Sequence, residues 1–183
     1  ERLVNYRFCS KGDFDGHTVG NLILAALTDI GGNLSSGIKL ISEILNMKGE
    51  VLPLTDECVT LMGEMEDGEV IEGEHHITLS PKKIKKVFYK EKAKANTEVL
   101  EKIKDADAII LSMGSLYTSI IPNLLCKDVV KAIDNSNAKI IYVCNVVTQP
   151  GETDNFKASD HVKLLNKYLG KRKVDTLITN SEE

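Results

Sequence analysis

The feature that most constrains the fold is a regular alternation of apolar runs and helix-like segments after Asn96. The apolar runs have the length of buried strands and are predicted at 107–111, 139–144 and 174–179. Segments of helical periodicity precede and separate them. Because proline suits the first turn of a helix, the first crossover helix should begin at or near Pro122. This order is typical of βαβ units, so the sequence predicts an α/β protein with three parallel strands and two crossovers.

Residues 56–90 differ from this pattern and are predicted to form a small antiparallel β insertion. The Asp-Gly pair at 67–68 is a strong hairpin signal, and a further strand is expected at 84–89. Seven acidic residues from Glu57 to Glu74 and seven lysines from Lys82 to Lys94 predict cross-strand ion pairs. His75 and His76 fall in the hairpin, where alternation would send their rings to opposite faces. No metal site is expected there.

The N-terminal part is predicted to be helical. Residues 17–30 form an almost continuous apolar block ended by two glycines, which indicates a helix buried on most sides and close to the core. A second, amphipathic helix should follow, with Asn33 or Ser35 as its N-cap. A length of 183 residues with 42% hydrophobic content suits a single domain, 1–183. Since the chain begins with Glu1, we expect an N-terminal truncation.

Composition excludes several classes of partner. The net charge is −4 and both signs are mixed along the chain, so nucleic acid is not an expected partner. No apolar stretch approaches the roughly 20 residues that cross a membrane, and the sequence predicts a cytoplasmic protein without membrane insertion. The four cysteines lack metal-binding spacing and are expected to be reduced and mostly in the core. Whether the chain forms a homo-oligomer stays open.

Two polar loops follow predicted parallel strands, where ligands bind in open α/β sheets. In the first loop, Gly114 allows close backbone approach, and Ser115, Thr118 and Ser119 add hydroxyls to exposed amides, which suits a diphosphate. A side chain at Gly114 would then fill the phosphate position. An alternative is that these residues only cap a helix and turn the chain.

The second loop carries a dense set of hydrogen-bonding groups that suit a nucleobase or a sugar. Its candidate ligand-binding residues are Asn145, Thr148, Gln149, Gly151, Glu152 and Thr153. An alternative is a Pro-Gly turn with ordinary surface polarity. At the start of the following helix, Ser159 is the expected cap, Asp160 complements the helix dipole, and His161 is a candidate proton donor. A third stretch, 16–21, contains His17 and Asn21, which could reach the same crevice or reflect close helix packing.

Three motifs, GHTVGNLILAAL, GSLYTSIIPNLL and VCNVVTQPGETDNFKASDH, resemble signatures of the gluconeogenesis factor family. These bacterial cytosolic proteins are similar to the 2-phospho-L-lactate transferases of deazaflavin cofactor synthesis. The resemblance covers essentially the whole chain. It implies a Rossmann-like three-layer fold and a UDP-sugar ligand, in a protein that supports cell shape and growth on gluconeogenic carbon sources.

Carried over by position, the resemblance places Gly114, Ser115, Tyr117 and Thr118 in a phosphate-proximal motif. It assigns the second loop and the stretch with His17 and Asn21 to two further motifs. The family usually has Gly-Pro-Gly-Ser at 112–115 and methionine at position 147, and it is longer than this chain. The function expected is a nucleotide-sugar-binding regulator. The alternative is an enzyme that transfers a phospholactyl group to a deazaflavin.

Overall fold

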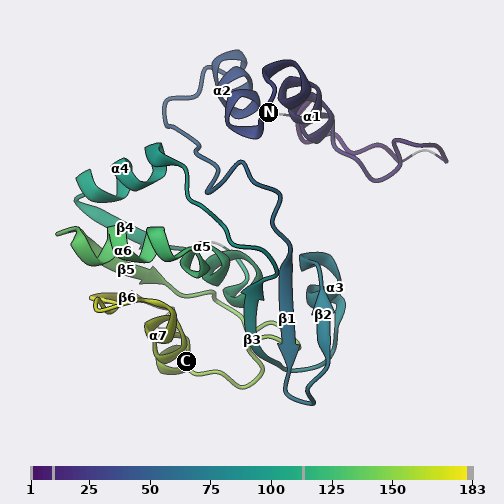
Figure 1. The fold of residues 1–183 in the computed structure, drawn as a ribbon. Helices are drawn as coiled ribbons and strands as arrows, with labels where there is room; N and C mark the ends of the chain where they lie inside the picture. The colour runs from purple at the N-terminus through teal and green to yellow at the C-terminus, as the bar shows by residue number, and fades with distance from the viewer. Residues whose placement is uncertain (1, 10, 113, 181–183) are drawn as a thin grey trace. The chain divides into compact units, whose positions relative to one another are not determined.

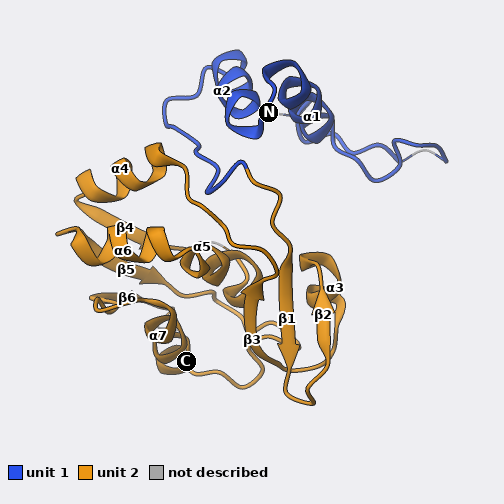
Figure 2. Cartoon of the chain, viewed as in Figure 1, with its two compact units in different colours: residues 1–56 blue, residues 57–183 orange. Residues whose placement is uncertain are grey.

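The computed structural model describes residues 2–9, 11–112 and 114–180. Two compact units divide the chain, unit 1 at residues 1–56 and unit 2 at residues 57–183 (Figure 2). The prediction that 1–183 forms a single domain stays a prediction.

Unit 1 consists of an N-terminal segment and two helices that contact each other, α1 (Val19–Gly31) and α2 (Leu34–Ile44). Asn33 caps α2 as predicted, because its side chain accepts a hydrogen bond from the Ser36 N–H at 2.8 Å. The prediction that the first helix is buried on most sides is wrong, since no residue of α1 is buried. Within unit 1, one partner helix and a short segment cannot surround an apolar helix.

The antiparallel insertion is confirmed as a three-stranded sheet of order β2-β1-β3. Its strands are β1 (Leu61–Met65), β2 (Val70–Glu72) and β3 (Ile84–Tyr89), and a turn at the Asp-Gly pair joins β1 to β2. The predicted cross-strand ion pairs are present. Glu64 on β1 contacts both Lys85 and Lys86 on β3, at 2.6 and 2.9 Å. Both lysines are exposed, whereas Glu64 is half-buried.

The segment with the two histidines is a helix, α3 (Glu74–Leu79), and the prediction that it continues the hairpin is wrong. Gly73 adopts φ +90°, which turns the chain out of β2. Ile77 is then buried against the sheet, with its side chain beside Gly63 on β1. The ring centroids of His75 and His76 lie 5.8 Å apart, and both residues are exposed. The burial of Ile77 favours the helix over an extended strand.

The parallel sheet is confirmed, with order β4-β5-β6 and the strands parallel throughout. The strands are β4 (Ala108–Leu111), β5 (Lys139–Val143) and β6 (Thr176–Ile178). Besides α3, unit 2 has four helices, α4 (Thr97–Asp105), α5 (Ile121–Leu125), α6 (Lys127–Asn135) and α7 (Ala158–Tyr168), and a π-helical turn, η1 (Leu116–Ile120), precedes α5 (Figure 1). Pro122 lies in the first turn of α5, as expected. The α/β class with a Rossmann-like parallel sheet and a small antiparallel sheet is therefore confirmed.

Side chains of the parallel sheet divide into a covered and an exposed face. Paired residues point to the same side, so Leu111 and Tyr142 share the face that is buried beneath helices. Tyr142 is fully covered, and its hydroxyl lies 2.9 Å from His161 Nδ1 on α7. On the opposite face, Ile110 is 61% exposed and Ile178 is 51% exposed. The core of unit 2 therefore lies between the sheet and its helices.

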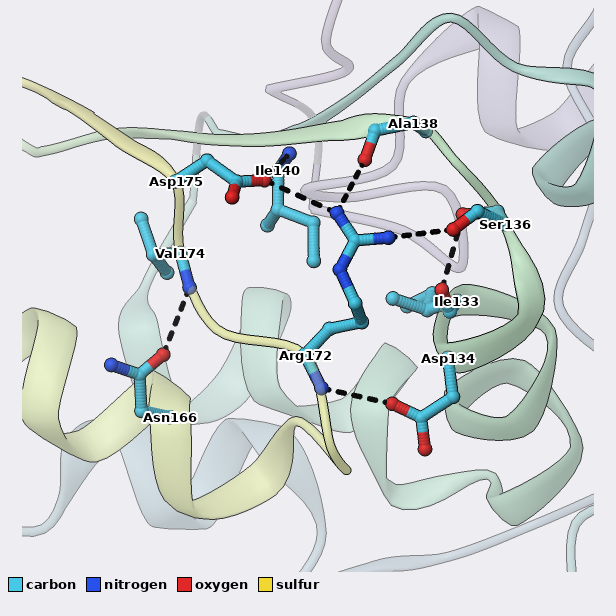
Figure 3. A network of polar contacts seen from close by, with 9 residues as sticks. All are labelled: Ile133, Asp134, Ser136, Ala138, Ile140, Asn166, Arg172, Val174 and Asp175. Carbon is cyan, nitrogen blue, oxygen red and sulfur yellow. Dashed lines mark hydrogen bonds and ion pairs between the residues drawn. The ribbon is translucent and has the colours of Figure 1, made fainter.

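A polar network holds the ends of β5 and β6 where the two strands begin (Figure 3). The Arg172 guanidinium donates to the carbonyl oxygens of Ser136 and Ala138, at 2.6 and 2.8 Å. Asp175 accepts from the Ile140 N–H at 2.8 Å and pairs with Arg172 at 3.3 Å. The connection from α7 to β6 is thereby fastened to the connection from α6 to β5.

Candidate functional site

The two predicted ligand loops lie together at the carboxyl ends of β4 and β5. Asn145 donates from Nδ2 to the Gly114 carbonyl oxygen at 3.0 Å. Gln149 donates from Nε2 to the Ser115 hydroxyl at 2.8 Å. Side chains of the second loop thus form hydrogen bonds with residues of the first loop that lie more than 30 positions earlier in the chain. The position beyond the strand ends follows from the parallel order of the sheet.

A cavity of about 390 Å³ lies beside these contacts. Its lining residues are Ser112, Val143, Cys144, Asn145, Val146, Val147 and Gln149. The volume falls in the range of small-molecule sites, which begins at roughly 300 Å³. The sequence analysis predicted Asn145 and Gln149 in this lining but not the valines Val143, Val146 and Val147. The position of these valines at the end of β5 and directly after it was the signal that could have found them.

Glu152 of the second loop is buried, and its side chain contacts the first residues of η1. Its carboxylate accepts from the Tyr117 N–H at 3.3 Å and from the Thr118 hydroxyl at 3.5 Å, and the Ser115 hydroxyl also hydrogen-bonds it. Burial raises the pKa of Glu152, and these hydrogen bonds oppose that rise in part. The negative group that contacts this turn is therefore a side chain of the protein. Tyr117 and Thr118 were predicted to lie near a diphosphate, but the Tyr117 N–H and the Thr118 hydroxyl donate to the Glu152 carboxylate.

The remaining residues of the second loop shape its turn. Thr153 is buried and accepts from the Gln149 N–H at 2.8 Å through Oγ1. Gly151 adopts φ +80°, and an added Cβ would lie 2.7 Å from the Ser80 carbonyl oxygen. Its own carbonyl oxygen accepts from the Ile84 N–H at 3.2 Å, which ties the loop to β3. Thr148 is exposed.

Gly114 does not face open space. A Cβ built on Gly114 would lie 2.6 Å from Ser119 Cβ, so the glycine permits the loop to approach η1 closely. The expectation that a side chain here would fill a phosphate position is therefore corrected, because the side chain would first meet Ser119.

The groups at the start of α7 also differ from expectation. The helix begins at Ala158, and Asp160 accepts from the Lys157 N–H at 3.0 Å, so Ser159 lies inside the helix and is not its cap. The hydrogen bond from the Lys157 N–H lowers the pKa of Asp160. His161 is 4% exposed, and burial lowers its pKa. Its place between Tyr142 and Phe156 is that of a core histidine.

His17 and Asn21 belong to unit 1. The Asn21 N–H donates to the Thr18 hydroxyl at 3.2 Å, which caps α1. Their predicted approach to the loops of unit 2 stays a prediction. Cys9 and Cys58 are exposed, so the expectation that the cysteines lie mostly in the core is wrong, although all four are free.

No cluster of three or more histidine, cysteine or acidic side chains suits a metal ion among residues 2–9, 11–112 and 114–180. Within the same residues, every helix is too short or too polar to cross a lipid bilayer.

The fold and these loops define a Rossmann-like α/β protein with a ligand-type crevice beyond the parallel strands. The model of the family 2-phospho-L-lactate transferase CofD matches residues 1–183. The chain therefore belongs to this family. The resemblance seen in the sequence is confirmed.

Relatives and solved structures agree with this family. The chain is 45% identical to the Gluconeogenesis factor of Bacillus subtilis, over all of this chain and 58% of that protein. It is 44% identical to the Gluconeogenesis factor of Halalkalibacterium halodurans, over all of this chain and 57% of that protein. A crystal structure of a Bacillus halodurans protein superposes with a TM-score of 0.94 at 43% identity, covering 100% of this chain and 59% of that chain. The chain thus spans less than two thirds of each.

Proposed function

We propose that this chain provides a binding site for a nucleotide sugar of the UDP type and acts as a regulator. It belongs to a gluconeogenesis factor of the cytoplasm, which supports cell shape and growth on gluconeogenic carbon sources. The observation that carries the proposal is the junction of the two loops beside the cavity of about 390 Å³. The names of the relatives support the gluconeogenic role. The apolar wall and the amides suit a base or a sugar.

The alternative, a transferase that joins a phospholactyl group to a deazaflavin, is supported by the name of the matching family. The side chains that the sequence offered for its proton transfer have other partners. Asp160 caps α7, and His161 is buried against Tyr142. A regulator that binds its ligand without transforming it is therefore favoured.

Isothermal titration calorimetry with UDP-N-acetylglucosamine tests the proposal. The chain of 183 residues and the full-length Bacillus subtilis relative are titrated in parallel. We expect saturable heat with both proteins. Absence of heat with both would contradict the proposal. Incubation with activated phospholactate and a deazaflavin acceptor, followed by mass spectrometry, would favour the transferase if product forms.

A further inference from the structure

Another cavity, of about 210 Å³, lies where the second loop meets β3, and we call it the Tyr117 cavity. Its buried lining residues are Ile84, Tyr117, Gly151 and Glu152, and Phe156 is a half-buried member of the same lining. The Ile84 N–H donates to the Gly151 carbonyl oxygen at 3.2 Å, which joins the strand to the loop. The volume lies below the roughly 300 Å³ at which sites for drug-sized molecules begin, so the cavity suits a small molecule.

The Tyr117 side chain brings a polar atom without a partner into this cavity. Tyr117 is 4% exposed, and its hydrogen bond to Glu152 comes from the backbone N–H, so its hydroxyl has no partner among the described residues. The hydroxyl keeps accessible surface, because Gln149 Oε1 is the one side-chain atom of the described chain that is both inaccessible and without a partner. It interacts electrostatically with Glu152 and Glu66, two carboxylates of the same lining. The hydroxyl therefore faces the cavity.

Glu152 brings a negative charge that no cation of the protein balances. It is 6% exposed and lines the Tyr117 cavity. Its hydrogen-bond donors, the Tyr117 N–H and the hydroxyls of Ser115 and Thr118, are all neutral. No cationic side chain of the described residues pairs with it, and Glu74 acts on it with the same sign. Buried charges in proteins are usually paired, so a positive group in this cavity would supply the missing counter-charge.

The exposed part of the lining is also more negative than positive. All of its members are charged, and they are Glu66, Lys83, Lys85 and Asp154. Lys85 already pairs with Glu64, at 2.6 Å. Together with Glu152, the carboxylates of the lining therefore outnumber its lysines. Because no acidic cluster of the described residues suits a metal ion, the cation that this cavity favours is an organic one.

We propose that the Tyr117 cavity binds a small molecule by its primary ammonium group. The Tyr117 hydroxyl accepts a hydrogen bond from the ammonium, and Glu152 supplies the opposite charge. Ile84 and Phe156 contact the carbon atoms next to the nitrogen. This site goes beyond the proposed function, because a UDP-sugar carries negative phosphates and the cavity beside Gln149 is a different one.

Chemical-shift titration of the ¹⁵N-labelled chain at neutral pH tests the proposal. The probes are propylammonium, 1-propanol and propionate, which have similar length and a positive, a neutral and a negative end group. Two amide signals report on the cavity, because the Tyr117 N–H donates to Glu152 and the Gly151 N–H donates to Asp154 at 2.7 Å. We expect propylammonium to shift both signals saturably, with a Kd of about 1 to 10 mM for a ligand of this size. The other two probes should bind at least about 10-fold more weakly.

Three variants assign the effect to named groups. Tyr117→Phe removes only the hydroxyl and should weaken propylammonium binding by about 10-fold. Tyr89→Phe is the matched control, because Tyr89 is a half-buried tyrosine of β3 outside this lining, and it should bind propylammonium as the wild type does. Glu152→Gln should abolish the preference for propylammonium over 1-propanol. Should Glu152→Gln fail to fold, Tyr117→Phe and the wild-type titrations decide.

Three results would overturn this inference. The first is equal affinity of the wild-type chain for the three probes. The second is a propylammonium effect on the two amide signals that does not saturate at constant ionic strength. The third is unchanged propylammonium binding by a folded Tyr117→Phe. None of them affects the calorimetry with UDP-N-acetylglucosamine, so the failure of this inference and the failure of the proposed function are separate outcomes.

Discussion

At the scale of single residues, Glu152 organises the junction of the two loops. It is 6% exposed, yet its carboxylate has hydrogen-bond donors from Tyr117, Thr118 and Ser115. Burial disfavours the charged form of a carboxyl group and raises its pKa. A buried carboxylate with this many donors is a structural element of the loop.

The raised pKa of Glu152 predicts a pH dependence of stability. The folded protein binds the proton of Glu152 more tightly than the unfolded chain does, so stability falls as pH rises from the ordinary value of 4.5 through the raised value. Glu152→Gln cannot ionise. As the pH rises through this range, the unfolding free energy of the wild type should therefore fall relative to that of Glu152→Gln. Above the range, the difference between the two proteins should stay constant.

Urea unfolding at a series of pH values measures this difference and cancels the titration of all other groups. Glu43→Gln, the same change at an exposed glutamate on α2, is measured in parallel as the control. A difference that stays constant from pH 4 to pH 8 would show that burial does not shift Glu152 (about 4.5 is the ordinary value of a glutamate).

Gly114 gives a second prediction at this scale. Gly114→Ala should lower the unfolding free energy by about 1–3 kcal/mol, because the new Cβ would meet Ser119 Cβ. Ser119→Gly in the same chain should restore most of that loss. Thermal or urea unfolding compares both variants with Gly49→Ala, where nothing lies within 4 Å of an added Cβ. If Ser119→Gly does not restore the unfolding free energy lost in Gly114→Ala, contact with Ser119 is not the cause of that loss.

At the scale of elements, the parallel strands depend on contacts at both of their ends. The loops after β4 and β5 are joined through Asn145 and Gln149, and the segments before β5 and β6 are joined through Arg172. Arg172 has the planar guanidinium needed to donate to two carbonyl oxygens at once (Figure 3).

Arg172→Met should destabilise the protein by about 2 kcal/mol, because the carbonyl oxygens of Ser136 and Ala138 lose their charged donor. Arg172→Lys should recover less than half of this loss, since an ammonium group lacks the forked geometry. Lys171→Met is the matched control, because its contact with Asp134 is made by the backbone N–H, which the substitution keeps. Equal stability of Arg172→Met and wild type would contradict a structural role for the network.

The elements that could be predicted are those with local signals. Apolar runs located β3 to β6 within a few residues, the Asp-Gly pair marked the turn between β1 and β2, and Asn33 marked the start of α2. The helix α3 was missed because the burial of Ile77, a tertiary contact, determines it. Likewise, the sequence placed Glu152 on the correct loop but could not show that its carboxylate turns inward to η1.

At the scale of the whole molecule, burial is concentrated in unit 2. Every buried hydrophobic side chain among the described residues lies between Leu61 and Leu169. In the first unit, only Gly37 is buried among the described residues. Unit 2 therefore has an apolar core of its own, built from residues within 57–183.

This distribution predicts that residues 57–183 fold without unit 1. Produced alone, this fragment should unfold cooperatively in urea, with a free energy within about 1 kcal/mol of that of the whole chain, because the core is retained. The measurement is far-ultraviolet circular dichroism during denaturation. A non-cooperative transition of the fragment would show that unit 1 stabilises it.

The two amide contacts to the first loop have one more consequence. Asn145 and Gln149 hold Gly114 and Ser115 in place through bonds within the protein. These two residues therefore lose conformational freedom when the protein folds and not when a ligand binds. Ligand binding at this loop then carries a smaller entropic cost, because the surface is already ordered.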